Sequence, residues 1–306
     1  LSSEQKEMIA EIGGERKLFK GIPLNTQLCY SEESVREKLA EEVAVYAENH
    51  PETDVIHFWL ADDYNNVCEC PQCAKKSLSD WYVMILNRID DKLTERHIDT
   101  KICFLVYFEL YWAPTTERIV HEDRFIMMFA PLFRSYTTSF GNSRIDKTEY
   151  PTNPGAYLNF WQDWKKIFHG DTFDFDYHLM WDINRDFGGE TLAKVLFDDV
   201  RSLKKFGMNG FMSCQLQRAF YPNGLPFYLL GRALADGSET LDDIRKTYYS
   251  AAFGKYATFA EEAYGMLEKY VPFSYVREET SGKKYISLIE TGREKIKEKL
   301  KEMPEE

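Results

Sequence analysis

The sequence predicts an α/β fold: a (β/α)8 TIM-type barrel that lacks its first strands, followed by a helical C-terminal extension. Two observations lead to this prediction. Apolar strand-like runs alternate with helical patterns up to residue 216, as in a parallel sheet covered by helices. Beyond about residue 226 the patterns are almost wholly helical. We expect a partial barrel domain over residues 1–225 and a helical segment over residues 226–306 that packs on the barrel or follows it.

Strands are expected where apolar runs lie between turn residues. They are residues 21–30, 54–61, 101–110, 124–130, 172–182 and 211–216. These six strands are two fewer than a complete barrel needs. We therefore expect the missing strand–helix units upstream of Leu1.

Helices are expected where apolar residues recur every three or four positions. They are residues 3–11, 32–49, 79–96, 155–168 and 190–206. Gly13 and Gly14 are expected to end the first helix, because glycine favours helix C-termini. Ser31 is expected to cap the second helix, because serine favours the N-cap position.

The composition argues against several classes of partner and cofactor. The 306-residue chain has a formal net charge of −12, which opposes binding to nucleic-acid phosphates and to anionic lipid surfaces. No apolar run reaches the roughly 20 residues of a membrane span, so we expect no membrane insertion. No glycine-rich phosphate loop follows a predicted strand, and we expect no cofactor. The 19 Tyr, 21 Phe and 6 Trp exceed the needs of a core, and aromatic faces can stack on sugars.

The strongest functional signal is a pair of neighbouring acids, Asp62 and Asp63, after the apolar strand 54–61. Adjacent carboxylates repel one another, so holding both at one strand end has a cost that favours a chemical role. Two further acids, Glu109 and Asp182, lie near the ends of other predicted strands, and strand ends converge at one face of a barrel. The alternative is that the aspartates only cap the loop by accepting backbone N–H bonds.

Aromatic and polar residues near the same strand ends are predicted to line a sugar-binding cleft. They are Tyr107, Tyr111, Trp112, Arg134, Tyr177, Trp181, Asp182 and Gln215. Adjacent acids cannot flank a glycosidic bond from opposite sides, as the usual retaining pair does. They fit the variant in which the 2-acetamido group of the sugar attacks, one acid holds its N–H and the other protonates the leaving oxygen.

Three closely spaced cysteines, Cys68, Cys70 and Cys73, follow the acid pair. They can hold zinc only if folding supplies a fourth ligand, such as Cys29 or a histidine. A disulfide and plain loop packing are the alternatives, and our main expectation is that no metal is bound. The remaining cysteines, Cys103 and Cys214, lie in apolar strands and are expected to be core residues.

The segments that carry these residues resemble a bacterial family described as a domain of unknown function, part of which is glycoside hydrolase family 163. The resemblance rests on the acid pair and C-x-C-x-x-C loop of DVIHFWLADDYNNVCECPQC, on the helix that follows, and on KICFLVYFELYWAP. It covers roughly residues 20–255. It implies a TIM-barrel enzyme of extracellular or periplasmic location, similar to endo-β-N-acetylglucosaminidases that act on N-glycans.

The resemblance also implies roles for the acids. Asp62 would orient the acetamido group and Asp63 would be the general acid/base, with Glu109 as a competitor for the second role. The main hypothesis is a retaining, acetamido-assisted hydrolase of β-linked N-acetylglucosamine with an oligosaccharide or glycan as substrate. The alternatives are a glycan-binding barrel without activity and an α-glucuronidase-like hydrolase in which Arg134 or Arg218 pairs with a uronate.

Overall fold

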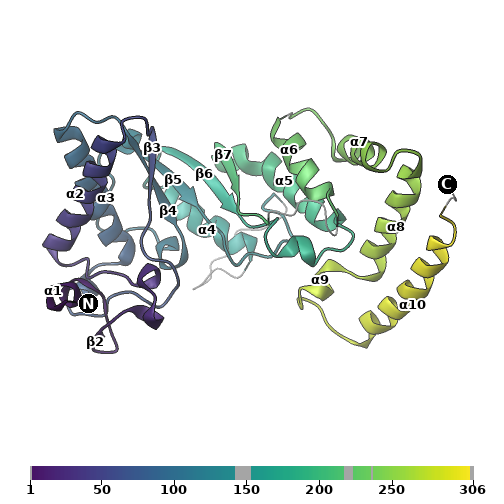
Figure 1. The fold of residues 1–306 in the computed structure, drawn as a ribbon, viewed down its shortest axis with the longest axis horizontal. Helices are drawn as coiled ribbons and strands as arrows, with labels where there is room; N and C mark the ends of the chain where they lie inside the picture. The colour runs from purple at the N-terminus through teal and green to yellow at the C-terminus, as the bar shows by residue number, and fades with distance from the viewer. Residues whose placement is uncertain (1, 142–152, 217–222, 236, 304–306) are drawn as a thin grey trace. The chain divides into compact units, whose positions relative to one another are not determined.

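The computed structural model describes residues 2–141, 153–216, 223–235 and 237–303, and it divides into two compact units (Figure 1). Unit 1 comprises Leu1–Leu132 and Ala156–Asp174. Unit 2 comprises Phe133–Gly155 and Phe175–Glu306. The predicted boundary near residue 225 therefore falls inside unit 2.

A parallel β-sheet carries the predicted functional residues. Its strands are β3 (Val55–Phe58), β4 (Lys101–Val106), β5 (Phe125–Phe129), β6 (Asp171–Asp176) and β7 (Gly210–Ser213), in that order across the sheet. The pairs β3/β4, β4/β5 and β5/β6 are parallel. The predicted α/β class with a parallel sheet is thus confirmed, but the described residues do not form a closed barrel.

The predicted strand at residues 21–30 is wrong. The segment instead forms two 3-10 turns, η1 (Phe19–Gly21) and η2 (Pro23–Asn25), and its β-type pairing in the described residues is an isolated bridge between Leu28 and Ile9. Its local chemistry explains the difference. Pro23 cannot donate a ladder hydrogen bond, and Gly21 has a φ of 75° that no strand uses.

The first helix is shorter than predicted, because α1 (Ser3–Met8) ends before the two glycines. Gly13 and Gly14 form the turn between β1 (Glu11–Ile12) and β2 (Glu15–Arg16), which pair antiparallel. Both glycines have positive φ, 60° and 77°, as a tight primed hairpin turn requires.

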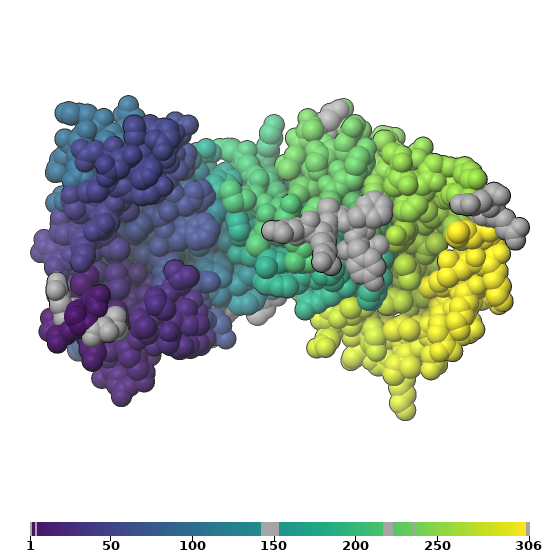
Figure 2. All heavy atoms as spheres, in the orientation of Figure 1, coloured from purple at the N-terminus to yellow at the C-terminus, as the bar shows by residue number. Residues whose placement is uncertain are grey.

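In unit 1, helices α2 (Glu33–Asn49) and α3 (Leu78–Glu95) pack side by side (Figure 1), and the atoms of this unit form one closely packed body (Figure 2). A third helix, α4 (Pro154–Lys165), ends in this unit. Phe104 of β4 contacts Tyr82 of α3 and Trp164 of α4, with ring centroids 6.2 and 5.8 Å apart. Helices α3 and α4 therefore cover the same face of the sheet. Short turns complete the unit: η3 (Cys73–Lys75), η4 (Phe108–Tyr111) and η5 (Glu122–Arg124).

Unit 2 is mainly helical, as predicted for the end of the chain. Besides β7, its elements are η6 (Asp182–Asn184), α5 (Glu190–Phe206), α6 (Leu225–Ala235), α7 (Leu241–Phe253), η7 (Gly254–Tyr256), α8 (Ala257–Tyr270), α9 (Phe273–Val276) and α10 (Lys283–Leu300). Helix α5 matches its predicted range and ends at Gly207, whose φ is 77°. In the part of the chain that the structure describes, no helix combines the length and apolar character needed to cross a bilayer.

Candidate functional site

The acid pair lies just beyond the carboxyl end of β3, as predicted. The loop is fixed by its backbone, because the Asp62 N–H donates to the carbonyl of Leu24 at 3.0 Å. Asp63 has a φ of 72°, a left-handed conformation that aspartate tolerates better than most residues. The Asp63 N–H donates to Oδ1 of Asp62 at 2.8 Å, so one acid caps the next residue. The pair is thus a local turn as well as two acids.

Asp63 is held as a carboxylate. Its Oδ2 accepts hydrogen bonds from Lys20 Nζ at 2.6 Å and from Asn25 Nδ2 at 3.2 Å, and its Oδ1 accepts from the Tyr64 N–H at 2.9 Å. The hydrogen bond from Lys20 is the main reason that the pKa of Asp63 lies below its usual value. The side chain is only 14% exposed. These contacts favour the charged form, which is the wrong form for a proton donor at neutral pH.

Asp62 is exposed and meets a residue from the next strand. The hydroxyl of Tyr107, the first residue after β4, donates to Oδ1 of Asp62 at 3.2 Å. The carboxyl ends of β3 and β4 therefore bring a carboxylate and a phenol together, as expected for neighbouring parallel strands. Such a pair can bind an amide group through two hydrogen bonds: the carboxylate accepts the amide N–H, and the hydroxyl donates to the amide carbonyl.

Glu109, in η4, reaches the loop that carries the acid pair. Its Oε1 accepts the backbone N–H of Asn65 at 2.7 Å, and among the described residues its Oε2 has no hydrogen-bond partner. The preceding residue, Phe108, has a φ of 48°, which is strained for a bulky side chain. Phe108 also contacts the rings of Tyr64 and Tyr107, with centroids 5.5 and 3.9 Å apart. The structure thus gathers Asp62, Asp63, Tyr107 and Glu109 within two adjacent loops of unit 1.

The two aromatic residues that follow Glu109 differ in accessibility. Tyr111 is fully buried, and its hydroxyl donates to the carbonyl of Ala130 at 2.7 Å, so it supports the β5 end and does not line a cleft. Trp112 is 39% exposed and packs edge-on against Phe160 of α4, with centroids 4.9 Å apart. Both residues were predicted to line a sugar-binding cleft, but of the two only Trp112 is accessible to a ligand.

Five other predicted residues belong to unit 2, and three of them, Tyr177, Trp181 and Asp182, lie close together in the sequence. Asp182 is buried and pairs with Arg185 at 3.0 Å and closely with Arg277, so its carboxylate is already neutralised within the unit. Trp181 is 47% exposed and stacks on the buried Tyr177, with planes 4° apart. A stacked, exposed tryptophan is the geometry of a sugar platform, and it is also an ordinary surface arrangement.

Gln215, also in unit 2, is exposed just beyond β7. Arg218 lies outside the described residues.

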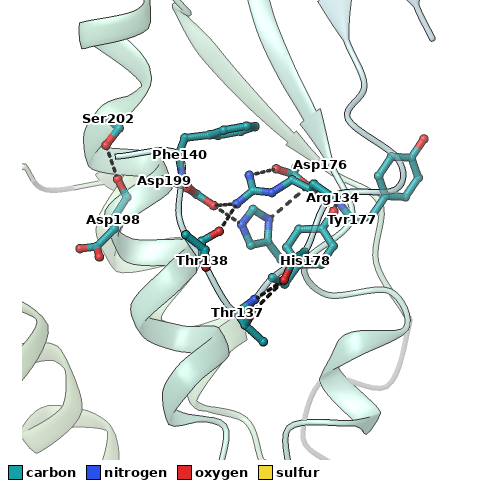
Figure 3. A network of polar contacts seen from close by, with 12 residues as sticks. Arg134, Thr137, Thr138, Phe140, Asp176, Tyr177, His178, Asp198, Asp199 and Ser202 are labelled. Atoms are coloured by element: carbon teal, nitrogen blue, oxygen red, sulfur yellow. Dashed lines mark hydrogen bonds and ion pairs between the residues drawn. The ribbon is translucent and has the colours of Figure 1, made fainter. Parts of the chain in front are cut away.

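Arg134 is a core residue of unit 2 and not part of a cleft (Figure 3). Its guanidinium donates to Asp176 at 2.9 Å and to Asp199 at 2.6 Å, and both carboxylates are fully buried. His178 Nε2 lies 2.7 Å from the same Asp199 oxygen, and Tyr136 donates to Asp176. A buried cation needs such pairing, so the role of Arg134 is to hold this network together.

The sequence contained a signal for this network. Asp176 lies inside the predicted strand 172–182, and a carboxylate within an apolar strand needs a buried partner. The sequence does not indicate Arg134 as the partner of Asp176, because the two residues are 42 positions apart.

A second candidate group is a cluster of four buried thiols, which we call the cysteine cluster. It consists of Cys29, Cys68, Cys70 and Cys73, whose sulfur atoms all lie within 4.8 Å of one another. The sequence spacing indicates three of these cysteines as possible metal ligands, and folding brings Cys29 to them as the fourth thiol. Ser31, predicted as the cap of α2, faces this cluster instead: its N–H points at the Cys73 sulfur at 3.4 Å, and Glu32 takes the N-cap position.

Comparison with known proteins assigns the chain to a family. The DUF4838 family, described as a domain of unknown function, matches residues 5–264. Neither the curated proteins nor the solved structures include a significant match. The matched range contains the acid pair, the cysteine cluster and strands β3 to β7. Because it covers more than half of the chain, the protein is a member of the DUF4838 family, a domain of unknown function.

Proposed function

We propose that this protein is a glycoside hydrolase that cleaves β-linked N-acetylglucosamine in glycans by a retaining, acetamido-assisted mechanism. The observation that carries the proposal is the contact between Asp62 and Tyr107 at the carboxyl ends of adjacent parallel strands. Reactive groups of parallel α/β folds gather at that end of the sheet. Positive φ at Asp63, Asn65 and Phe108 adds backbone strain to the same two loops, and such strain clusters at functional sites.

In this proposal Asp62 and Tyr107 bind the 2-acetamido group of the substrate. The amide offers one N–H donor and one carbonyl acceptor, which match a carboxylate and a phenolic hydroxyl. Asp62 accepts the N–H and so directs the carbonyl oxygen to the anomeric carbon. A bond forms between these two atoms as the bond to the leaving oxygen breaks. Water then opens the resulting oxazolinium ion, whose N–H stays hydrogen-bonded to Asp62, with retention of configuration.

We assign the general acid to Glu109. Lys20 lowers the pKa of Asp63 and so favours its carboxylate form, which cannot donate a proton. Glu109 is half-buried, and only one of its oxygens is bonded to the acid-pair loop in the part of the chain that the structure describes. It would protonate the leaving oxygen and then remove a proton from the attacking water. Asp63 would keep the loop in place through its bonds to Lys20 and Asn25.

Exposed aromatic rings near these acids would stack on the sugar. Trp112 follows η4 and is 39% exposed, and Tyr64 in the acid-pair loop is 46% exposed. Stacking of a sugar on such rings buries apolar C–H surface while leaving the hydroxyl groups wet. This supports a carbohydrate as the substrate over a charged phosphate ligand.

The experiment compares single variants on two substrates, a p-nitrophenyl β-chitobioside and a natural chitobiose-linked glycan. Glu109→Gln should reduce kcat by about 10²–10⁴-fold on the glycan. The loss should be smaller on the nitrophenyl substrate, because its leaving group needs little protonation. Asp62→Asn should impair both substrates alike, since acetamide orientation precedes departure of either leaving group. Asp54→Asn, an exposed acid at the opposite end of β3, is the matched control and should leave activity unchanged.

The outcomes separate the competing assignments. A larger, leaving-group-dependent loss in Asp63→Asn than in Glu109→Gln would transfer the acid role to Asp63. A wild-type protein that binds chitobiose by calorimetry but releases no reducing ends would make it a glycan-binding module. The burial of Arg134 argues against that residue as the partner of a uronate.

A further inference from the structure

The cysteine cluster combines thiols from two segments that are distant in the sequence. Cys29 precedes α2, and the other three cysteines lie in the loop between β3 and α3. All four are buried in unit 1, with exposed fractions from 0% to 6%. Beside them pack Ala10 and Ile12, next to and in β1 of the N-terminal hairpin. The cluster therefore lies where the hairpin, the start of α2 and the β3–α3 loop meet.

The sulfur–sulfur distances fit a metal site better than a disulfide. The Cys29 sulfur lies 3.7 Å from that of Cys70 and 3.8 Å from that of Cys73. Bonded sulfurs in a disulfide are about 2.0 Å apart. Four sulfurs at about 2.3 Å from a central zinc ion, in a tetrahedron, are about 3.8 Å apart. We propose that the cysteine cluster holds one structural zinc ion.

The surroundings supply what four thiolates around a dication require. Backbone N–H groups point at three of the sulfurs: Glu11 at Cys68 at 3.3 Å, Ser31 at Cys73 at 3.4 Å, and Cys73 at Cys70 at 3.4 Å. Such donors stabilise the negative charge on a ligand sulfur. The guanidinium of Arg16 in β2 interacts with Cys29 and brings a positive charge to the remaining sulfur.

The geometry assigns a structural role and not a catalytic one. Four protein thiolates fill a tetrahedral zinc, whereas a catalytic zinc keeps one position for water or substrate. The burial of all four sulfurs agrees with a closed site. Zinc would fix the loop that starts at Asp62 and ends at Cys73, and so would hold the acid-pair turn against η2.

The choice of zinc follows from the ligand set. Four thiolates in a tetrahedron select zinc or iron among the common metals, and they disfavour calcium and magnesium, which need oxygen ligands. Zinc needs no redox partner and serves as the usual purely structural ion in such sites. The proposal is independent of the glycosidase assignment.

The experiment measures metal and thiol state on the full chain purified without added metal or chelator. We expect about one zinc per chain by elemental analysis, and release of that zinc when a mercurial reagent blocks the thiols. Cys29→Ser should lower the zinc content to less than about one-tenth of that value. Cys214→Ala, a half-buried cysteine in unit 2, is the matched control and should retain the full content.

A second measurement covers the case in which Cys29→Ser does not fold. Wild-type protein exchanged into cobalt should show the visible bands of tetrahedral cobalt thiolate. Mass spectrometry of the unreduced protein should find all four thiols free after zinc removal. A zinc content near zero, a disulfide within the cluster, or iron in place of zinc would each overturn the proposal.

Discussion

Asp80 shows how one buried carboxylate can organise two loops at the end of the sheet. It accepts the hydroxyl protons of Ser77 at 2.7 Å and Thr115 at 3.0 Å, and the N–H groups of Thr116 and Glu117 at 2.8 and 2.9 Å. It therefore joins the first turn of α3 to the segment after η4. Burial raises the pKa of Asp80, but these hydrogen bonds, the one from Ser77 foremost, outweigh burial and the net pKa is lowered.

Replacing Asp80 with Asn should destabilise the protein and change its response to acid. We expect a loss of about 2–4 kcal/mol of unfolding free energy at pH 7, measured by urea denaturation, because an amide cannot accept all of these bonds. The folded pKa lies below the unfolded value of about 3.9, so the contribution of Asp80 is complete above that pH. It is lost as the pH falls through the folded pKa.

The acid limb of the stability curve should therefore be flatter in Asp80→Asn than in the wild type. Asp91→Asn is the control, because Asp91 is an exposed residue of the same helix whose one side-chain ion pair within the described residues is a 3.5 Å contact with Arg88. Its effect should stay within about 0.5 kcal/mol. An acid limb as steep in Asp80→Asn as in the wild type would contradict this account.

At this scale the sequence identifies candidate acids but not their charge states. Asp62, Asp63 and Glu109 could be found because each follows an apolar strand. The pairing of Asp63 with Lys20 could not be foreseen, since the two are 43 positions apart and meet only through the turns that replace the predicted strand at 21–30. A pKa depends on neighbours in space, so the roles of the acids could not be assigned from the sequence alone.

At the scale of elements, α8 and α10 approach each other closely at one glycine. Gly292 is buried in α10, and a Cβ added there would lie 2.2 Å from the Cβ of Tyr270 at the end of α8. Contact of this kind is possible only without a side chain. The glycine therefore sets the distance between the helices at this point.

Gly292→Ala should destabilise unit 2, although alanine is the better helix former. Helix propensity would favour alanine by about 1 kcal/mol, but the clash with Tyr270 should cost more, leaving a net loss of about 1–3 kcal/mol in thermal or urea unfolding. Gly265→Ala in α8 is the matched control, because nothing lies within 4 Å of its added Cβ, and it should be neutral or stabilising. Equal effects of the two substitutions would show that the close approach is not maintained.

The elements that could be predicted are those whose signal is local. Helix α5 has its predicted bounds because its periodicity and Gly207 mark both its face and its end. The predicted strand 101–110 is too long, because Phe108 and Leu110 are apolar but are buried in η4 instead of in the sheet. Apolar content alone cannot separate a strand from a buried turn.

At the scale of the whole molecule, strand alternation predicts a parallel sheet but not whether that sheet closes. Closure depends on how many strands pair and on their stagger, which a local pattern does not encode. The cysteine cluster likewise depends on contacts between residues that are distant in the sequence. Cys29 lies 41 positions from Cys70, and only the packing of the N-terminal hairpin and α2 brings their sulfurs together. Three of the four thiols could therefore be found by spacing, and the fourth could not.

The zinc proposal predicts that metal removal acts on one part of the molecule. All four sulfurs belong to unit 1, where they join β1, the start of α2 and the loop before α3. Peptides from residues 8–16 and 66–76 should exchange amide hydrogen at least about 10-fold faster after treatment with a strong chelator, since local opening loses the metal–ligand bonds. Peptides from α8 and α10, in the other unit, should keep their rates.

The same chelator should not alter exchange in Cys29→Ser, which lacks the ion from the start. Faster exchange throughout both units would mean that the ion stabilises more than the junction it occupies, and unchanged exchange at the hairpin would remove its structural role.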